Sequence, residues 1–481
     1  MVGAAWGMRP RAWSVLFMAG LPDAKIDIVR TLVRDAPDKV VTGLRNALAL
    51  ADGDTALAGV RRVVDAEVDD RNLRNKVLEP IAPLFVGDGS ASDRLNFPAR
   101  ALTLLWRGLK AQAPDEIGAA TRFLPDYQPD ESSTEPFDSL VEQLAYGLQV
   151  GEQRDYVAAL EMIEGAKPGG TGVLLSCLAM SAVVRRATLR LPEWISRTTQ
   201  ERAAAARLAY RDACRFGDDA GPCFFEMLGA QLAEPWTILR IVSAVMDRPA
   251  EGYLAGSELS VFATRLMDQL DVNLKKVSGF DLNGGVAAGA AAAATVETLT
   301  LQITELENAI DLGREGGWGG RIHKQKLSLA GVVESRLREL PKLQNAALPS
   351  HKVRVARATV SEPRLTIEPD MKLVDRCRSL LAFAEGIRAS ANYGGFSSTR
   401  AKVIEAAGET LDQYVEDVLS LVRDDEVPDR EIAGRFLQVA AEFASPIHEP
   451  RAGDIVRRRA ATAFGAVRPQ RPNLEDPAKL L

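Results

Sequence analysis

The chain has 481 residues, of which 46% are hydrophobic and 26% charged, a composition typical of a folded globular protein and not of a disordered one. Its 59 basic and 65 acidic side chains give a net charge of -6, which excludes a general attraction to nucleic acid or to an anionic membrane. A chain of this length is too long to fold around a single hydrophobic core of ordinary size, so roughly two to four structural units are expected.

Residues 1–124 are predicted to form an N-terminal helical array. Apolar residues recur there at helical spacing in short units separated by turn signals, which is typical of stacked helix pairs. Ahead of these units, Arg9 and Arg11 precede an apolar run, residues 12–21, that resembles an export signal. Because no small-x-small cleavage site follows, a cytoplasmic protein is favoured, with the run read either as a signal or as a core helix.

Residues 125–136 carry three prolines and four acids and are predicted to be a linker before a second helical region, residues 137–283. Within that region, Pro168–Gly172 resembles a phosphate-binding loop. No Lys-Ser or Lys-Thr pair follows it, and the preceding residues have helical periodicity. The favoured interpretation is therefore the start of a buried helix.

Residues 284–345 are predicted to form an antiparallel helical hairpin whose turn is Gly316–Gly320. Apolar residues follow a heptad spacing on both arms: Val296, Leu299, Ile303, Leu306 and Ile310 on the first, and Ala330, Val333, Leu337 and Leu340 on the second. Each stripe is too short for a free-standing coiled coil, so packing against the rest of the chain is favoured.

The prolines and short alternations in residues 346–371 indicate an extended crossing or a strand pair, and this is the clearest predicted domain boundary. Residues 372–446 are predicted to be a C-terminal bundle of three helices. Residues 447–481 are predicted to be a proline-containing basic tail. The expected fold class is all-α, with a solenoid-like N-terminal array, a central antiparallel hairpin and a C-terminal bundle.

No catalytic residue, metal ligand or cofactor is predicted. The cysteines Cys177, Cys214, Cys223 and Cys377 lack metal-binding spacing and are expected to be reduced thiols. None of the histidines, His323, His351 and His448, follows an acid by three residues or belongs to a nucleophile elbow. No dinucleotide-binding glycine pattern follows a strand. Whether the protein is an enzyme stays open, and a non-enzymatic role is favoured.

The hairpin tip is the least ordinary local pattern. Trp318 stands among four glycines, Arg314 and Glu315 precede it, and Arg321, Lys324 and Lys326 follow it. One hypothesis is that Trp318 anchors a protein partner. A second is that the amides of the glycine-rich helix start hold an anion with help from the cations. The third and simplest hypothesis is that the tip packs against the rest of the chain.

Arg457, Arg458 and Arg459 in the predicted tail are candidate contacts for an acidic partner or nucleic acid. The alternative is a solvated tail without a ligand. Nucleic-acid binding through any other part of the chain is not favoured. No membrane span is expected, because no run approaches the roughly twenty apolar residues that a span needs.

The favoured function is that of an interaction or scaffold protein of the bacterial cytoplasm. Such a protein would bind another protein, or a second copy of itself, through helical grooves and the hairpin tip. An enzyme or a sensor of a small ligand or anion, with a site built from distant helices, is one alternative. A self-assembling structural protein is another. A pocket with convergent Arg, Asp or Glu side chains would favour the sensor, and a long apolar groove would favour the scaffold.

Overall fold

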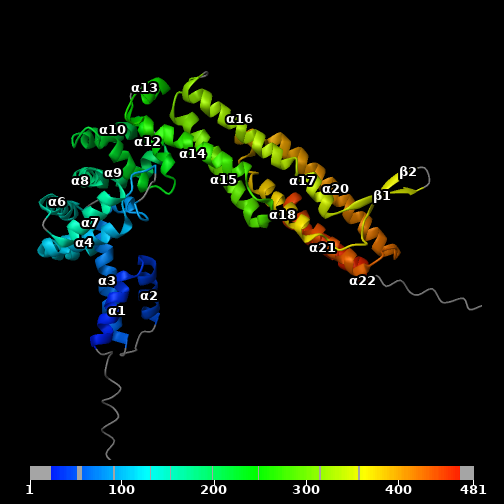
Figure 1. The fold of residues 1–481 in the computed structure, drawn as a ribbon, viewed down its shortest axis with the longest axis horizontal. Helices are drawn as coiled ribbons and strands as arrows, with labels where there is room; N and C mark the ends of the chain where they lie inside the picture. Colours follow the sequence, from blue (N-terminus) through cyan, green and yellow to red (C-terminus); the bar gives the residue numbers. More distant parts are fainter. Residues whose placement is uncertain are drawn as a thin grey trace, which may run out of the picture. The chain divides into compact units, whose positions relative to one another are not determined.

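The computed structural model describes residues 23–50, 57–89, 93–129, 132–151, 153–197, 199–246, 249–313, 316–355 and 358–465 (Figure 1). These residues are almost entirely helical, with one two-stranded ribbon, so the all-α class is confirmed. The chain divides into two compact units, Met1–Asp247 and Arg248–Leu481. This division differs from the boundary expected at residues 346–371, which lie inside the second unit. The apolar run at residues 12–21 lies outside the described residues.

The first unit, coloured blue to green in Figure 1, is a series of helices joined by short turns. In chain order they are α1 (Asp23–Asp35), α2 (Asp38–Leu50), α3 (Ala58–Val77), η2 (Ala82–Leu84), α4 (Ala99–Gln112), α5 (Pro114–Phe123), η3 (Leu124–Asp126), α6 (Glu135–Val150), α7 (Arg154–Ala166), α8 (Gly170–Ala179), α9 (Ser181–Ser196), α10 (Gln200–Cys214), α11 (Ala220–Ala230), η4 (Pro235–Ile238) and α12 (Leu239–Val245). Part of the predicted linker is thus helical, because η3 and the start of α6 fall within residues 125–136.

Helices α1, α2 and α3 share a small apolar core. Its buried members are Val33, Val41, Leu48, Val64 and Val68. The far end of α3 is held by Arg185 of α9, which is 1% exposed. Its guanidinium donates to the carbonyls of Lys76 and Val77, at 2.6 and 2.7 Å, and to Asp138 at 2.8 Å. Because the last carbonyls of a helix lack partners within it, these bonds stabilise the end of α3.

The glycine-rich turn that resembles a phosphate loop begins helix α8. The backbone N–H groups of Gly169 and Thr171 donate to the two carboxylate oxygens of Glu164, at 2.6 and 3.3 Å. These bonds hold the pKa of Glu164 below its ordinary value. A carboxylate of the chain itself therefore occupies the place that a phosphate would need.

The second unit contains the longest helices and the strand pair. In chain order its elements are α13 (Glu251–Ala255), α14 (Ser260–Ser278), η5 (Leu282–Gly284), α15 (Gly285–Ala309), α16 (Gly317–Leu337), α17 (Leu340–Ala347), β1 (Ser350–Val355), β2 (Ala358–Pro363), α18 (Met371–Gly386), α19 (Ala391–Gly394), α20 (Ser397–Asp424), α21 (Arg430–Ile447) and α22 (Ala452–Gly465). Strands β1 and β2 are antiparallel, with Ser350 opposite Pro363 and Val353 opposite Val360.

The predicted hairpin arms, α15 and α16, are both present, but they make few contacts with each other. Helix α15 packs mainly against α18 and α14, and α16 mainly against α14. Gly289 permits the close approach of α15 to α18, because a Cβ atom there would lie 2.0 Å from the carbonyl oxygen of Ser379. The apolar faces are wider than a two-helix seam, so neighbouring helices bury them.

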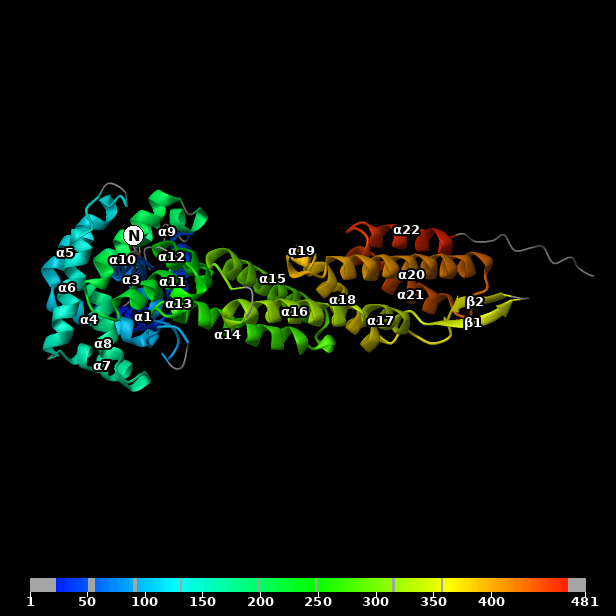
Figure 2. The ribbon, with the colours of Figure 1, turned by 90° about the horizontal axis from the view of Figure 1, so that it is seen from above.

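Helices α20, α21 and α22 pack together at the end of the described chain and run side by side in Figure 2. Val456 and Ala463 of α22 are buried in the same core as α20 and α21. The predicted basic tail therefore begins as a packed helix, because apolar residues at helical spacing accompany its arginines. The rest of that tail, residues 466–481, lies outside the description.

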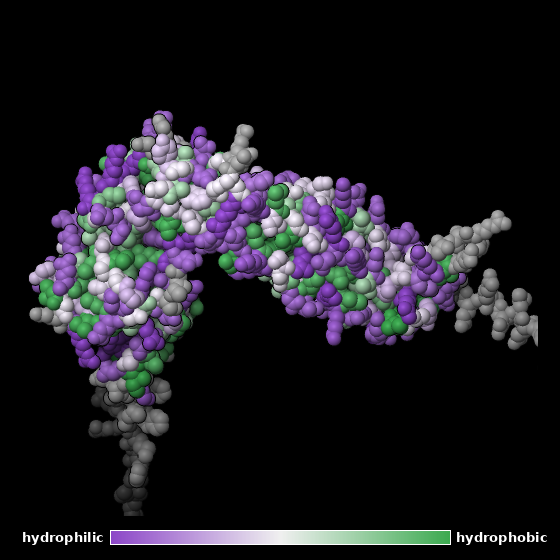
Figure 3. All heavy atoms as spheres, turned by 45° about the horizontal axis from the view of Figure 1, so that its top comes forward, coloured by the Kyte–Doolittle hydropathy of each residue, from purple (hydrophilic) through white to green (hydrophobic). Residues whose placement is uncertain are grey.

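One helix among the described residues, Leu282–Ala309, has the length and hydropathy of a membrane span, and 44% of its apolar window is buried within the protein. The pair α8 and α9 meets the same criteria only when taken together across a bend of 67°. Core helices of water-exposed proteins share these properties, so length and composition do not place α15 in a membrane. On the face drawn in Figure 3, hydrophilic side chains predominate and apolar ones form scattered areas.

Candidate binding cleft in the first unit

The first unit contains an open cleft of about 1770 Å³. Its sides are formed by α1 with the turn into α2, by one face of α3, and by α4 with parts of α7. Eight arginine and lysine side chains line it, against five aspartates and glutamates, so the lining has an excess of positive charge. Apolar side chains such as Val63, Leu102 and Met162 also line the cleft.

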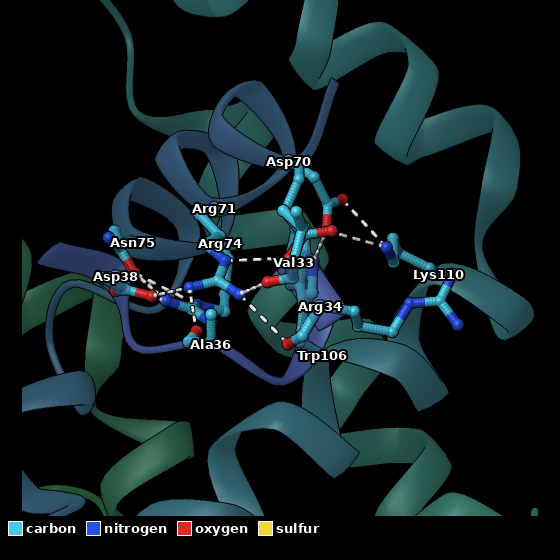
Figure 4. A network of polar contacts seen from close by, with 11 residues as sticks. Val33, Arg34, Ala36, Asp38, Asp70, Arg71, Arg74, Asn75, Trp106 and Lys110 are labelled. Carbon is cyan, nitrogen blue, oxygen red and sulfur yellow. Dashed lines mark hydrogen bonds and ion pairs between the residues drawn. The ribbon is translucent and has the colours of Figure 1, made fainter. Parts of the chain in front are cut away.

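Arg71 of α3 is the centre of the polar network that forms one side of this cleft (Figure 4). Although it is an arginine, it is only 7% exposed. Its Nη2 donates to the carbonyls of Val33 and Arg34, at 2.9 and 3.1 Å, and its Nη1 donates to the carbonyl of Ala36 at 2.8 Å. The guanidinium thereby binds the open C-terminal end of α1.

The remaining donors of Arg71 bind carboxylates. Nε donates to Glu67, one helical turn earlier, at 2.8 Å, and Nη1 donates to Asp38 of α2 at 2.6 Å. Arg74 donates to the other oxygen of Asp38 at 2.8 Å. Two arginines of α3 thus hold both α1 and α2 in place. Their positive charges are paired with carboxylates of the protein itself.

Asp70, on the same face of α3, connects that helix to α4. It accepts from Lys110 Nζ, at 2.8 and 2.9 Å, and from the indole Nε1 of Trp106 at 3.1 Å (Figure 4). Arg107 of α4 in turn donates to Asp155 of α7 at 3.2 Å. These bonds fix the distance between the sides of the cleft.

Three arginines of the lining differ from the rest. Arg34, Arg62 and Arg100 are exposed, and within the part of the chain that the structure describes they have no side-chain hydrogen-bond or ion-pair partner. They come from three separate helices, α1, α3 and α4. Their positive charges are therefore open to a ligand that enters the cleft.

The residues that line this cleft are far apart in the chain, so no local sequence pattern predicts it. One signal was present: Arg71 follows Val64 and Val68 at the spacing of a single helix face. A charged residue at a core position indicates a buried polar network. The spacing could not name its partners in α1 and α2.

At the predicted hairpin tip, the amides of the helix start are occupied. The N–H groups of Gly313, Trp318 and Gly319 donate to the carboxylate of Glu251, at 2.9, 2.5 and 3.2 Å. Gly317 leaves room for it, since a Cβ there would lie 1.9 Å from Glu251 Oε1. Burial alone would raise the pKa of Glu251, but these three hydrogen bonds outweigh it and hold the pKa below its usual value.

The cations of the tip have partners inside the second unit. Arg321 donates to Asp268 and Asp271 of α14, both at 2.6 Å, and Lys326 donates to Glu307 of α15 at 2.9 Å. Lys324 is exposed and has no such partner among the described residues, and Trp318 is half-buried. Arg314 and Glu315 lie outside the description.

The arginines predicted in the tail lie on α22. Arg457 pairs with Asp454 at 2.6 Å, and Arg459 pairs with Glu416 of α20. Arg458 donates through Nε to the carbonyl of Asp454 at 3.3 Å. Two of the three charges are thus paired with carboxylates of the second unit.

Among the described residues, no three His, Cys, Asp or Glu side chains are grouped so as to hold a metal ion. His323 and His351 are exposed, and His448 Nε2 lies 3.0 Å from Asp412. Comparison of the chain with protein-family models, with curated proteins and with solved structures finds no match.

Proposed function

We propose that this chain is a protein-interaction protein and that the cleft of its first unit binds an acidic, amphipathic helix of a partner. The observation that carries the proposal is the set of unpartnered arginines, Arg34, Arg62 and Arg100, around a lining that also contains apolar side chains. Carboxylates along the flanks of a bound helix would pair with these arginines. Its apolar face would contact side chains such as Leu102 and Met162.

The size and openness of the cleft favour a polypeptide over a small molecule. Sites for small ligands usually have volumes of roughly 300 to 1,000 Å³ and enclose most of the ligand. A cleft of about 1770 Å³ exceeds that range. An α-helix, about 10 Å across, would fill a larger share of it.

The chemistry of the lining favours an acidic protein segment over nucleic acid. Carboxylates, among them Asp35 and Asp70, also line the cleft and would repel a continuous phosphate backbone. Trp106 is 3% exposed and its N–H is bonded to Asp70, so its ring is not open for a base to stack on. A helix can present its carboxylates to the arginines alone.

The contacts at the hairpin tip support a structural role for that region, which moves the proposed binding site away from it. Glu251 fills the amide pocket, and Arg321 and Lys326 are paired. Trp318 and Lys324 remain the tip residues that a partner would reach. The tail arginines Arg457 and Arg459 are paired as well.

The test uses the full chain and a fluorescent designed peptide, an amphipathic helix with leucines on one face and glutamates on both flanks. A scrambled peptide of equal composition and a single-stranded RNA of matched charge are the comparison probes. The cleft variant is Arg34→Glu, Arg62→Glu and Arg100→Glu. The control variant, with the same change in charge on exposed arginines elsewhere in the unit, is Arg186→Glu, Arg190→Glu and Arg211→Glu.

We expect the helical peptide to bind more tightly than the scrambled one, and the cleft variant to weaken it at least about tenfold, because three charge contacts become repulsive. The control variant should bind within about twofold of the original chain. Equal loss in both variants, or tighter binding of RNA than of the peptide, would overturn the proposal.

A further inference from the structure

The first unit also holds two thiols that lie together at the packed surface of α8 and α11. Cys177 of α8 is completely buried, and Cys223 of α11 is partly exposed. Their side chains form a hydrogen bond with each other. The two helices pack against each other along this surface. The other cysteines are placed differently, since Cys214 is exposed and Cys377 is buried in the second unit.

The two thiols are chemically unequal. The hydrogen bond from Cys177 lowers the pKa of Cys223, and Lys167 adds to this effect, while burial and the carboxylates of Asp219 and Glu226 oppose it. At Cys177, the same contact and complete burial raise the pKa. Cys223 is thus the thiol that ionises more readily of the two, and it is also the one that solvent reaches.

We propose that Cys177 and Cys223 are a redox-active pair that forms a reversible intramolecular disulfide when the protein meets hydrogen peroxide. The proposal concerns a modification site and does not depend on the occupant of the cleft. The two thiols interact across helices α8 and α11, which pack against each other, so a disulfide would join side chains that already lie together.

The oxidation proceeds in two steps. The Cys223 thiolate attacks one oxygen of the peroxide, the O–O bond breaks, and the leaving hydroxide takes up a proton as water. The resulting sulfenic acid is attacked by the sulfur of Cys177, the S–O bond breaks, and the oxygen leaves as a second water with the Cys177 proton. Two thiols lose two electrons in total, and one peroxide becomes two waters.

The bond would join α8 to α11 and close a loop that contains α9 and α10. Cross-linking a loop restricts the unfolded chain, so the oxidised unit should be the more stable form. We expect the midpoint of thermal unfolding of the first unit to rise by roughly 5 to 10 °C on oxidation. A reductant such as dithiothreitol should reverse the rise.

The experiment treats the full chain with hydrogen peroxide, blocks the remaining thiols, and maps unreduced peptides by mass spectrometry. We expect one linked pair, Cys177 with Cys223, two hydrogens lighter than the separate peptides. In Cys177→Ser, Cys223 should stop at the sulfenic acid and react with dimedone. In Cys223→Ser, Cys177 should remain a free thiol. Cys377→Ser is the control and should form the disulfide as the original chain does.

Circular dichroism of each variant before oxidation establishes that it is folded. The proposal is overturned if peroxide leaves both thiols free in the original chain, or if Cys223 links to Cys214 instead. It is also overturned if dimedone labels Cys214 and not Cys223 in the folded Cys177→Ser variant. A disulfide that persists under dithiothreitol would contradict the reversible role.

Discussion

The cleft of the first unit and the tip of α16 in the second are both rich in cations, yet their charges are used differently. At the tip, Arg321 and Lys326 are paired with carboxylates of neighbouring helices. In the cleft, the side chains of Arg34 and Arg62 have no hydrogen-bond or ion-pair partner among the residues that the structure describes. A cluster of basic residues in a sequence therefore does not show that the region can bind an acidic ligand. What matters is how many of those charges the fold leaves unpaired.

The glycine-rich starts of two helices likewise have their binding groups occupied by the chain itself. The start of α8 and the start of α16 both resemble anion sites, because their amides lack partners within the helix. In each case a glutamate of the same chain binds those amides: Glu164 at α8 and Glu251 at α16. Such a turn is available to a ligand only when no internal carboxylate reaches it.

The largest effect that tests this comparison is expected from Arg71→Ala. The variant leaves the carbonyls of Val33 and Ala36 and the carboxylate of Glu67 without their buried donor. Losing one partner of such a network costs about 3 to 4 kcal/mol of unfolding free energy. Urea unfolding would measure it, and amide hydrogen exchange should show α1 and α2 opening first.

Arg62→Ala is the matched control, since Arg62 lies on the same helix and lines the same cleft but is exposed. Its unfolding free energy should stay within about 0.5 kcal/mol of the original value. Similar losses in the two variants would remove the distinction between structural arginines and those open to a ligand.

A smaller effect is expected from Glu251→Gln at the tip. The neutral side chain binds the three amides less well. The variant should therefore lose about 1 to 2 kcal/mol of unfolding free energy at neutral pH, as when other helix caps are removed. Because the folded pKa of Glu251 lies below its unfolded value, its contribution is fully present above the unfolded pKa. It is lost as the pH falls through the folded pKa.

The difference between the original chain and Glu251→Gln should therefore shrink on acidification below about pH 4. Denaturant titrations at a series of pH values would measure this. Glu297→Gln, at an exposed position of α15, removes one carboxylate elsewhere in the same unit and is the control variant for the titrations. A constant difference across the acidic range would mean that the charge of Glu251 does not matter.

Much of the fold was predictable from local patterns. The period of the apolar residues indicated helices, and the heptad residues Val296, Leu299 and Leu306 are indeed fully buried. What spacing could not give was the identity of the helix that covers them. The favoured expectation was packing of both arms against the rest of the chain, but the spacing did not indicate that α14 and α18 are the helices that cover α15.

The candidate site was less predictable than the fold. Arg71 is far in sequence from Val33 and Asp38, whose atoms it binds, so no local motif joins them. The separation of Cys177 from Cys223 hid their contact in the same way. Polar networks and thiol pairs depend on tertiary packing, and residue spacing reports only the local part of that packing.

The smallest effect is expected from Arg321→Ala. Its side chain is 35% exposed, and its partners Asp268 and Asp271 are 58% and 45% exposed, so solvent screens the pairs. The variant should lose no more than about 1 kcal/mol, and the loss should fall further in 1 M salt. Lys324→Ala, which removes an exposed cation, should lose less. If Arg321→Ala instead lost as much unfolding free energy as Arg71→Ala, the cations of the tip would contribute as much to stability as the network around Arg71. The exposed fraction of a charged side chain would then not distinguish charges that stabilise the fold from charges that are open to a ligand.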